Sequence, residues 1–201
     1  MFESEALGCQ GNNRLSPGPP VPYNPPMVRI VSKQDSGIRL SRDGRWFHAG
    51  EPFTNGNVIR FFHRAIRKDE RGEYYLYNRP ANFEEHVYFE VDDTAYFVWD
   101  LARDSADGEF RILLNTEAIE VLDLRTLHED ERGVMYCRVL DGDRARFTLQ
   151  ALTRLADHAE TDERGIYIAR NGERIYIPAP NPGCPGGQFS PLQGDFPHDG
   201  G

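Results

Sequence analysis

The sequence predicts an α+β fold built from two similar units of antiparallel strands, each with one packed helix. Three observations predict it: short strand-like segments between turn signals, two segments with helical periodicity, and a turn sequence that follows both helices. The chain has 201 residues and 14 prolines, and 12 of the prolines lie in residues 1–27 or 178–201. We therefore expect one domain at residues 28–177 between two disordered proline-rich tails.

The first unit, about residues 37–122, opens with a predicted hairpin. Residues 38–42 and 45–48 have strand character and flank Asp43-Gly44, a signal for a two-residue turn. Apolar residues at helical spacing then predict a helix over residues 57–68, with Thr54 or Asn55 as its cap.

Further strands complete the first unit. They are expected at residues 73–79, 86–91, 94–101, 109–115 and 118–122. The strand at residues 94–101 is the most apolar of them, so we expect it at the centre of a sheet.

The second unit, about residues 134–177, repeats this plan. An apolar strand surrounds Cys137, which is expected to be a small packed side chain. A helix is expected over residues 149–159 with Thr148 as its N-cap. Two strands then flank Asn171-Gly172, again a two-residue turn signal.

The tetrapeptide Asp-Glu-Arg-Gly occurs three times, at residues 69–72, 130–133 and 162–165. The first and third copies each follow a predicted helix and precede a strand that contains tyrosine. A shift of 93 residues aligns these copies and sets Tyr74 on Tyr167. Two explanations stay open: an internal duplication, or a composition that simply suits exposed turns.

Composition excludes several classes of function. The net charge of −9 disfavours binding to a phosphate backbone, and no apolar stretch approaches the length of about 20 residues that a membrane helix needs. The three cysteines form no paired motif, and the six histidines have no metal-ligand spacing. We therefore expect a cytoplasmic protein with no cofactor, no metal, no nucleic-acid partner and no membrane partner.

Aromatic and amide side chains supply the candidate binding residues. Trp46 and His48 alternate onto one face of the first hairpin, where they could floor a ligand pocket or form a half-buried strand face. Asn115, at the end of a strand, could cap a turn or present its amide to a ligand. Asp100, beside Trp99, could pair with Glu117 as the two carboxylates of a hydrolase.

Several of these segments resemble a known bacterial family. Residues 42–52, Arg60-Phe61-Phe62, residues 89–97 and residues 110–116 are similar to the family called domain of unknown function 1285, and a weaker similarity reaches residue 177. The resemblance implies an α+β protein with repeated structural motifs, no established enzymatic activity and a suggested role in signalling. It transfers no catalytic residue.

The sequence thus favours a cytoplasmic, non-catalytic module that binds a small molecule or a partner protein and has a regulatory role. The candidate ligand-binding residues are Trp46, His48, Arg60, Trp99, Asp100 and Asn115. A hydrolase that uses a pair of carboxylates is the alternative.

Overall fold

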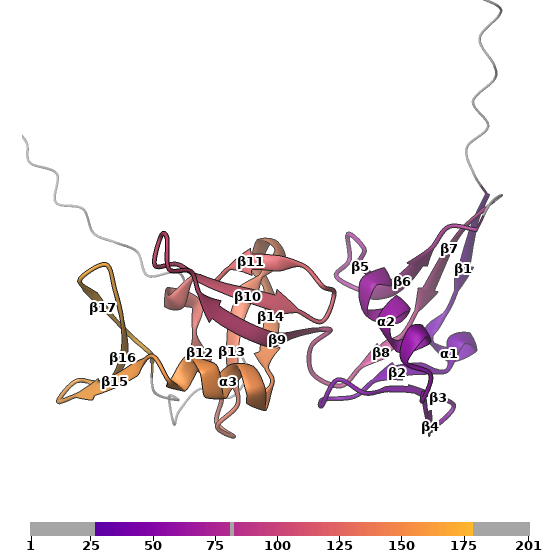
Figure 1. The fold of residues 1–201 in the computed structure, drawn as a ribbon. Helices are drawn as coiled ribbons and strands as arrows, with labels where there is room; N and C mark the ends of the chain where they lie inside the picture. Colours follow the sequence, from indigo (N-terminus) through magenta and orange to yellow (C-terminus); the bar gives the residue numbers. More distant parts are fainter. Residues whose placement is uncertain (1–26, 81–82, 179–201) are drawn as a thin grey trace, which may run out of the picture.

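The computed structural model describes residues 27–80 and 83–178. These residues form two lobes that follow one another along the chain (Figure 1). The tails expected at residues 1–27 and 178–201 therefore lie almost entirely outside the described residues. None of the helices in the described part of the chain is long and apolar enough to cross a membrane.

The N-terminal lobe contains two four-stranded sheets and two helices. The first sheet has the order β1 (Met27–Val31), β7 (Phe83–Tyr88), β6 (Tyr74–Asn78), β5 (Ile66–Lys68). The second has the order β4 (Glu51–Pro52), β3 (Trp46–His48), β2 (Ile38–Leu40), β8 (Glu90–Val91). The helices are α1 (Lys33–Ser36) and α2 (Gly56–Ala65).

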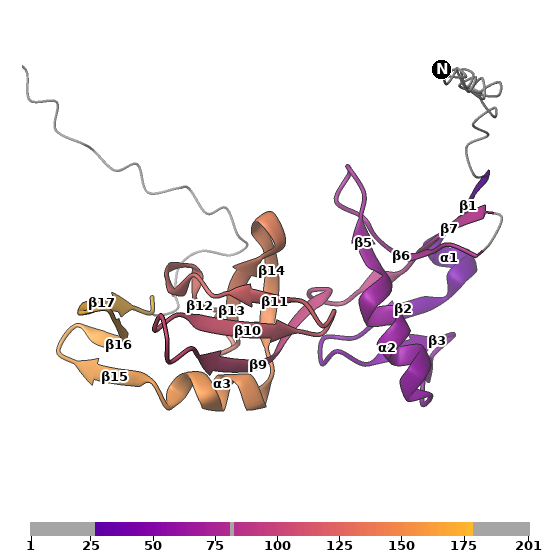
Figure 2. The same cartoon turned by 45° about the horizontal axis from the view of Figure 1, so that its top comes forward.

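The C-terminal lobe contains a six-stranded sheet, a three-stranded sheet and one longer helix. The six-stranded sheet has the order β11 (Ile119–Val121), β10 (Phe110–Leu114), β9 (Tyr96–Arg103), β14 (Asp143–Phe147), β13 (Met135–Val139), β12 (His128–Glu129). The other elements are α3 (Leu149–Ala156), the strands β15 (Ala159–Asp162), β16 (Gly165–Arg170) and β17 (Glu173–Tyr176), and the 3-10 turns η1 (Leu124–Thr126) and η2 (Leu140–Gly142). Figures 1 and 2 both place β15 to β17 at the end of the molecule far from the N-terminal lobe.

The helix α2 begins one residue before the predicted helix at residues 57–68 and ends three residues before it. Asn55 caps its start, because the side chain accepts hydrogen bonds from the N–H groups of Asn57 and Val58. At Ile66 the backbone becomes extended, with φ −56° and ψ 127°, and β5 pairs with β6. Residues 66–68, predicted as the last turn of the helix, therefore form a strand instead. The predicted helix at residues 149–159 ends early for the same reason, since β15 begins at Ala159.

The first hairpin forms as predicted but with a longer connection. The N–H of Gly44 donates to the carbonyl of Ser41 (2.9 Å), and the N–H of Ser41 donates to the carbonyl of Arg45 (2.9 Å). Gly44 has φ +80°, so the connection is a three-residue turn with a bulge rather than the predicted two-residue turn. Asn171-Gly172 does form the predicted two-residue turn, because Arg170 pairs directly with Glu173.

Two strands of the N-terminal lobe differ from the prediction. The strand expected at residues 86–91 is divided at Phe89 into β7 and β8, which belong to different sheets. No strand is predicted at residues 27–31, where β1 forms and pairs with β7 in parallel. Parallel pairing joins segments more than 50 residues apart, so no local turn signal marks it.

The two predicted units share the order helix, strand, turn, strand, strand. It is α2, β5, β6, β7 in the first and α3, β15, β16, β17 in the second. In each, a tyrosine of the middle strand pairs with a tyrosine of the last: Tyr75 with Tyr88, and Tyr167 with Tyr176. The hydroxyl of the last-strand tyrosine donates to the turn aspartate, Asp69 (3.1 Å) or Asp162 (2.8 Å). This recurrence supports duplication.

The alignment of the two units needs one correction. The predicted shift set Tyr74 on Tyr167, whereas the strand pairing makes Tyr75 the counterpart of Tyr167. The reason is that the first turn closes between Lys68 and Tyr74, while Asp162 pairs directly with Gly165 across a shorter turn.

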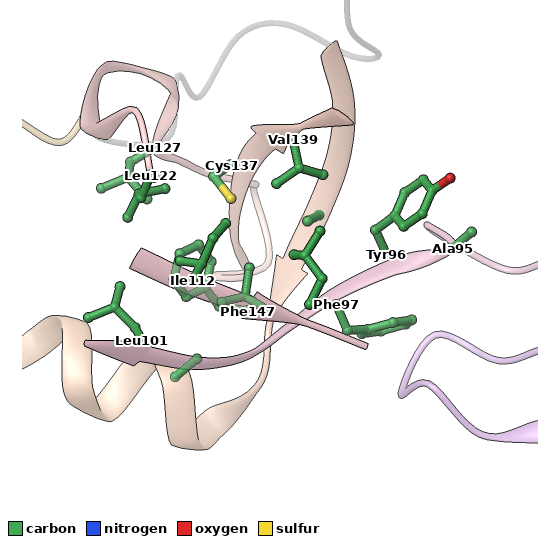
Figure 3. Packing of buried hydrophobic residues seen from close by; sticks show 14 of the residues in the cluster. Ala95, Tyr96, Phe97, Leu101, Ile112, Leu122, Leu127, Cys137, Val139 and Phe147 are labelled. Carbon is green, nitrogen blue, oxygen red and sulfur yellow. The ribbon is translucent and has the colours of Figure 1, made fainter. Parts of the chain in front are cut away.

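The two units share the six-stranded sheet. The expected interval between them, residues 122–134, contains η1 and β12 and separates β9 to β11 from β13 and β14. The strands β9 and β14 pair in parallel across that interval. The strand β9 is central, as predicted, and its first three residues are buried. Cys137, Ile112 and Phe147 point into the core of this lobe (Figure 3). Burial raises the pKa of the Cys137 thiol to about 12, which confirms it as a packed side chain.

Candidate functional site

A buried polar contact joins the two lobes. His63 lies on α2 in the N-terminal lobe, and Asn115 follows β10 in the C-terminal lobe. The Asn115 Nδ2 atom lies 2.9 Å from His63 Nδ1, and the two residues are 3% exposed (His63) and fully buried (Asn115). Trp46 and Trp99 pack edge-on against the His63 ring, with centroids 5.6 and 5.3 Å away. Three of the candidate residues from the sequence therefore meet around a histidine that the sequence analysis did not select.

The Asn115 amide is fully used inside the protein. Its Oδ1 atom accepts from the N–H of Phe97 (2.9 Å), and its Nδ2 atom donates to the carbonyl of Ala95 (3.0 Å) as well as facing His63. Both N–H groups of the amide thus face protein atoms, and the residue is fully buried. In this structure Asn115 holds the β10–β11 turn against β9.

His63 acts as an acceptor in this contact. Because the amide of Asn115 is the donor, Nδ1 of His63 is unprotonated and the ring is neutral. Burial lowers the pKa of His63 from 6.5 to about 4, since a charged ring would lose its solvation. The neutral histidine is thus part of the packing between the lobes.

Trp46 is buried rather than exposed. It is 1% exposed and packs against Phe62 (5.2 Å) and Phe89 (4.9 Å) as well as His63. Its indole Nε1 has no hydrogen-bond partner among the described residues. Trp46 therefore cannot floor an open pocket, because the aromatic cluster fills the space in front of it. His48, two residues along the strand, is exposed.

The remaining candidates are engaged in ion pairs on the surface. Arg60 lies 3.7 Å from Glu117, which also pairs with Arg64. Asp100 pairs with Arg154 at 2.8 Å. Both carboxylates of the hydrolase alternative, Asp100 and Glu117, are thus engaged by arginines of the chain.

A shallow hollow of about 540 Å³ lies between the lobes. Its lining residues are Ser41, Arg42, Asp43, Asp92 and Arg146. The first four come from the β2–β3 turn and from the end of β8 in the N-terminal lobe, and Arg146 comes from β14. A hydrogen bond from Arg146 Nη1 to the carbonyl of Arg42 (3.1 Å) links the two sides.

The acidic side chains in and beneath the hollow already have partners. Asp92 pairs with Arg39 at 2.6 Å, and Asp43 pairs with Arg45 at 2.6 Å. A hydrogen bond from Ser41 is the main cause that lowers the pKa of Asp43. Each of these two carboxylates is therefore paired with an arginine of its own lobe.

Beneath the hollow, Asp93 is an anchor for the C-terminal lobe. Its side chain is 4% exposed, accepts from the Tyr136 hydroxyl (2.8 Å) and pairs with Arg144 and Arg146. Arg42 is different, because its guanidinium has no ion pair or hydrogen bond with the described residues. In the hollow, the positive charge of Arg42 thus lies without an ion-pair partner among the described residues, beside carboxylates that are paired with arginines.

None of the residues selected from the sequence lines the hollow. The Asp43-Gly44 turn is predicted from the sequence only as a hairpin turn. Its position in a loop was the available signal, because loops between rigid elements often carry binding residues. The convergence with Arg146 depends on the pairing of β14 with β9, which no local pattern shows. In the part of the chain that the structure describes, no group of three or more possible ligands could hold a metal ion.

The comparisons with known proteins give a family and a fold. Residues 19–94 match the family model described as "Domain of unknown function (DUF1285), N-terminal domain". This confirms the predicted resemblance over the N-terminal lobe and extends it to residue 19, eight residues before β1. No curated protein matches the chain.

Two solved structures are similar to this chain. A DUF1285 family protein from Silicibacter pomeroyi DSS-3 has 21% identity and a TM-score of 0.53, with coverage of 82% of this chain and 90% of that chain. A DUF1285 family protein from Shewanella baltica OS155 has 12% identity and a TM-score of 0.46, with coverage of 61% of this chain and 91% of that chain. The first likeness shows that both lobes have the fold of a DUF1285 protein.

Proposed function

We propose that this chain, whose N-terminal lobe matches the DUF1285 family, is a non-catalytic binding module that takes a small molecule with an anionic group in the hollow between its lobes. The uncommitted Arg42 guanidinium, set among carboxylates that already have partners, is the observation that carries the proposal. A guanidinium recognises carboxylate and phosphate groups through charge-assisted hydrogen bonds.

A regulatory role follows from the position of the hollow. Its lining comes from both lobes, so a bound molecule would contact both and favour the arrangement in which they meet. A ligand that binds one arrangement better shifts the population toward it, and this is the physical basis of a sensor. A cytoplasmic location and the absence of a nucleic-acid partner remain predictions from the sequence.

The non-catalytic part of the proposal rests on the carboxylates. Asp43, Asp92 and Asp100 each pair with an arginine, and Glu117 pairs with two. Carboxylates that are held in ion pairs suit structure and binding better than proton transfer. No contact in the described residues favours the alternative hydrolase.

A thermal-shift screen of the full chain against carboxylated and phosphorylated metabolites tests the proposal. A molecule that binds the folded state should raise Tm, and the rise should grow with the logarithm of its concentration above Kd. Titration calorimetry with any hit should then show that Arg42→Ala weakens binding about 10- to 100-fold, the cost of losing one charge-assisted contact. Arg29→Ala is the matched control, because Arg29 lies in the same lobe and pairs with Glu85, and neither residue lines the hollow.

Two results would count against this site. If Arg42→Ala binds the hit as tightly as the native chain, the ligand lies elsewhere. If no metabolite raises Tm, the small-molecule version fails, and binding of a protein partner becomes the version to test by affinity capture and reconstitution.

A further inference from the structure

The β1–β7–β6–β5 sheet has two faces of different character. Leu76 and Ile66 are buried on the side that packs into the core. Side chains alternate across a strand, so the intervening residues lie on the other side. They form what we call the aromatic face, which consists of Val28, Ile30, Tyr75, Tyr77, His86 and Tyr88 together with the charged Arg67 and Glu84.

The aromatic face has a centre lined by rings, next to partly open aliphatic side chains on β1. The Tyr75 ring stacks on His86 at 4.4 Å, and Tyr77 contacts His86 at 5.7 Å. Ile30, next to His86 on the edge strand β1, is 67% exposed, and Val28 is 48% exposed. Contiguous exposed apolar side chains of this kind mark an interaction surface.

The equivalent face of the second unit is covered by its own arginines. Arg174 lies over the Tyr167 ring at 4.8 Å, and Arg164 lies over Tyr176 at 4.3 Å, so Tyr167 is only 5% exposed. In the described part of the first unit, no arginine or lysine lies over the rings of Tyr75 and Tyr77. The duplicated faces thus differ in their cover, and the first has room for another segment.

We propose that residues 15–26 of the same chain fold back over the aromatic face and occupy it. These twelve residues contain six prolines and no charged residue, which matches the part of the face formed by tyrosine, histidine, valine and isoleucine. Aromatic-lined surfaces bind proline-rich segments because the polyproline II helix is already extended and loses little entropy.

The connection of this segment to the sheet supports the same occupant. Residue 26 directly precedes β1, the edge strand that carries Ile30 and Val28 (Figure 1). Asn24-Pro25 provides a turn signal between the proline run and β1. The match to the family's N-terminal domain begins at residue 19, so the last eight residues of the segment belong to the recurrent domain.

The length of the proline-rich segment also matches the length of the strand β1. The five residues of β1 span about 17 Å at the rise of a strand. Residues 17–22 as a polyproline II helix span about 19 Å, so one reversal would lay them along the whole face. A tethered segment this close has an effective concentration in the millimolar range, which makes even a weak contact populated.

Photo-crosslinking in the full chain tests the proposal. The exposed Ile30 is replaced by p-benzoylphenylalanine, and the crosslinked peptides are identified by mass spectrometry after irradiation. The control carries the same amino acid at Ile166, which is 50% exposed on the sheet of the second unit. We expect crosslinks from position 30 to residues 15–26, with a yield about tenfold above that from position 166 because of the tether.

Isotope mixing distinguishes the occupants. In an equal mixture of unlabelled and ¹⁵N-labelled protein, crosslinks within one chain carry a single label state, whereas crosslinks between copies carry both. Crosslinks of mixed label would overturn the proposal in favour of a second copy, and an absence of tail peptides among the products of position 30 would also overturn it. Replacing Pro19, Pro20 and Pro22 by serine should lower the yield without changing Tm. This experiment is independent of the hollow at Arg42.

Discussion

The pH dependence of stability should be dominated by His63 between neutral pH and pH 5. The side chain is 3% exposed, and burial lowers its pKa from 6.5 to about 4. In this interval the unfolded chain binds a proton at His63 and the folded chain does not. The contribution is therefore fully present above pH 6.5 and is lost as the pH falls toward 4.

The magnitude follows from the two pKa values. A difference of one pKa unit corresponds to about 1.4 kcal/mol, so the shift of His63 allows a total loss of about 3 kcal/mol. At pH 5 the loss relative to pH 8 is about 2 kcal/mol, because most but not all of the interval has been crossed. A loss of this size is a large fraction of the stability of an ordinary domain.

Urea unfolding at pH 8, 6.5, 5.5 and 5 measures this effect. The free energy of unfolding of the native chain should fall by about 2 kcal/mol more than that of His63→Gln over this range. His48→Gln is the matched control, because His48 is exposed on β3, and it should keep the native pH dependence. Parallel curves for the native chain and His63→Gln would refute the assignment of a neutral, acceptor histidine at the junction between the lobes.

Substitutions at three further sites should lower the stability of the fold, and a fourth substitution, at Gly56, serves as a comparison. Asn115→Ala leaves the buried groups around it unpaired and should lower the free energy of unfolding by about 3 kcal/mol or more, measured by urea unfolding at pH 8. Gly72→Ala places a side chain at φ +85° and should cost about 1 kcal/mol, while Gly56→Ala, at the start of α2 with open space around it, should be neutral or stabilising. Asp93→Ala removes the acceptor of the Tyr136 hydroxyl and should lower Tm by several degrees; an unchanged Tm would show that the arginines at this position find other partners.

The sequence was informative where structure depends on local rules. The cap at Asn55, the cap at Thr148 and the turn at Asn171-Gly172 each involve residues within a few positions of one another, and all three are confirmed. The central position of β9 is also confirmed, because a run of apolar residues can be buried on both faces only inside a sheet. Element order, and with it the α+β class, could therefore be predicted.

The candidate site could be predicted only in part. Trp46, Trp99 and Asn115 do come together, but around His63 and inside the protein. A sequence pattern shows which residue types can bind, and it does not show whether their polar atoms are already used. The hydrogen bonds of Asn115 answer that question, and they link segments about 20 to 50 residues apart.

The sequence by itself determined the helix starts, the order of most strands, the repeated turns and the acidic, proline-flanked composition, because these depend on neighbouring residues and on residue counts. The tertiary structure alone decided which side chains stay free to bind. Parallel pairing of β14 with β9 brings Arg146 to Arg42, and parallel pairing of β1 with β7 extends the aromatic face. Such pairings join distant segments without a local turn, so the physical information that specifies them lies in the packing of the whole chain.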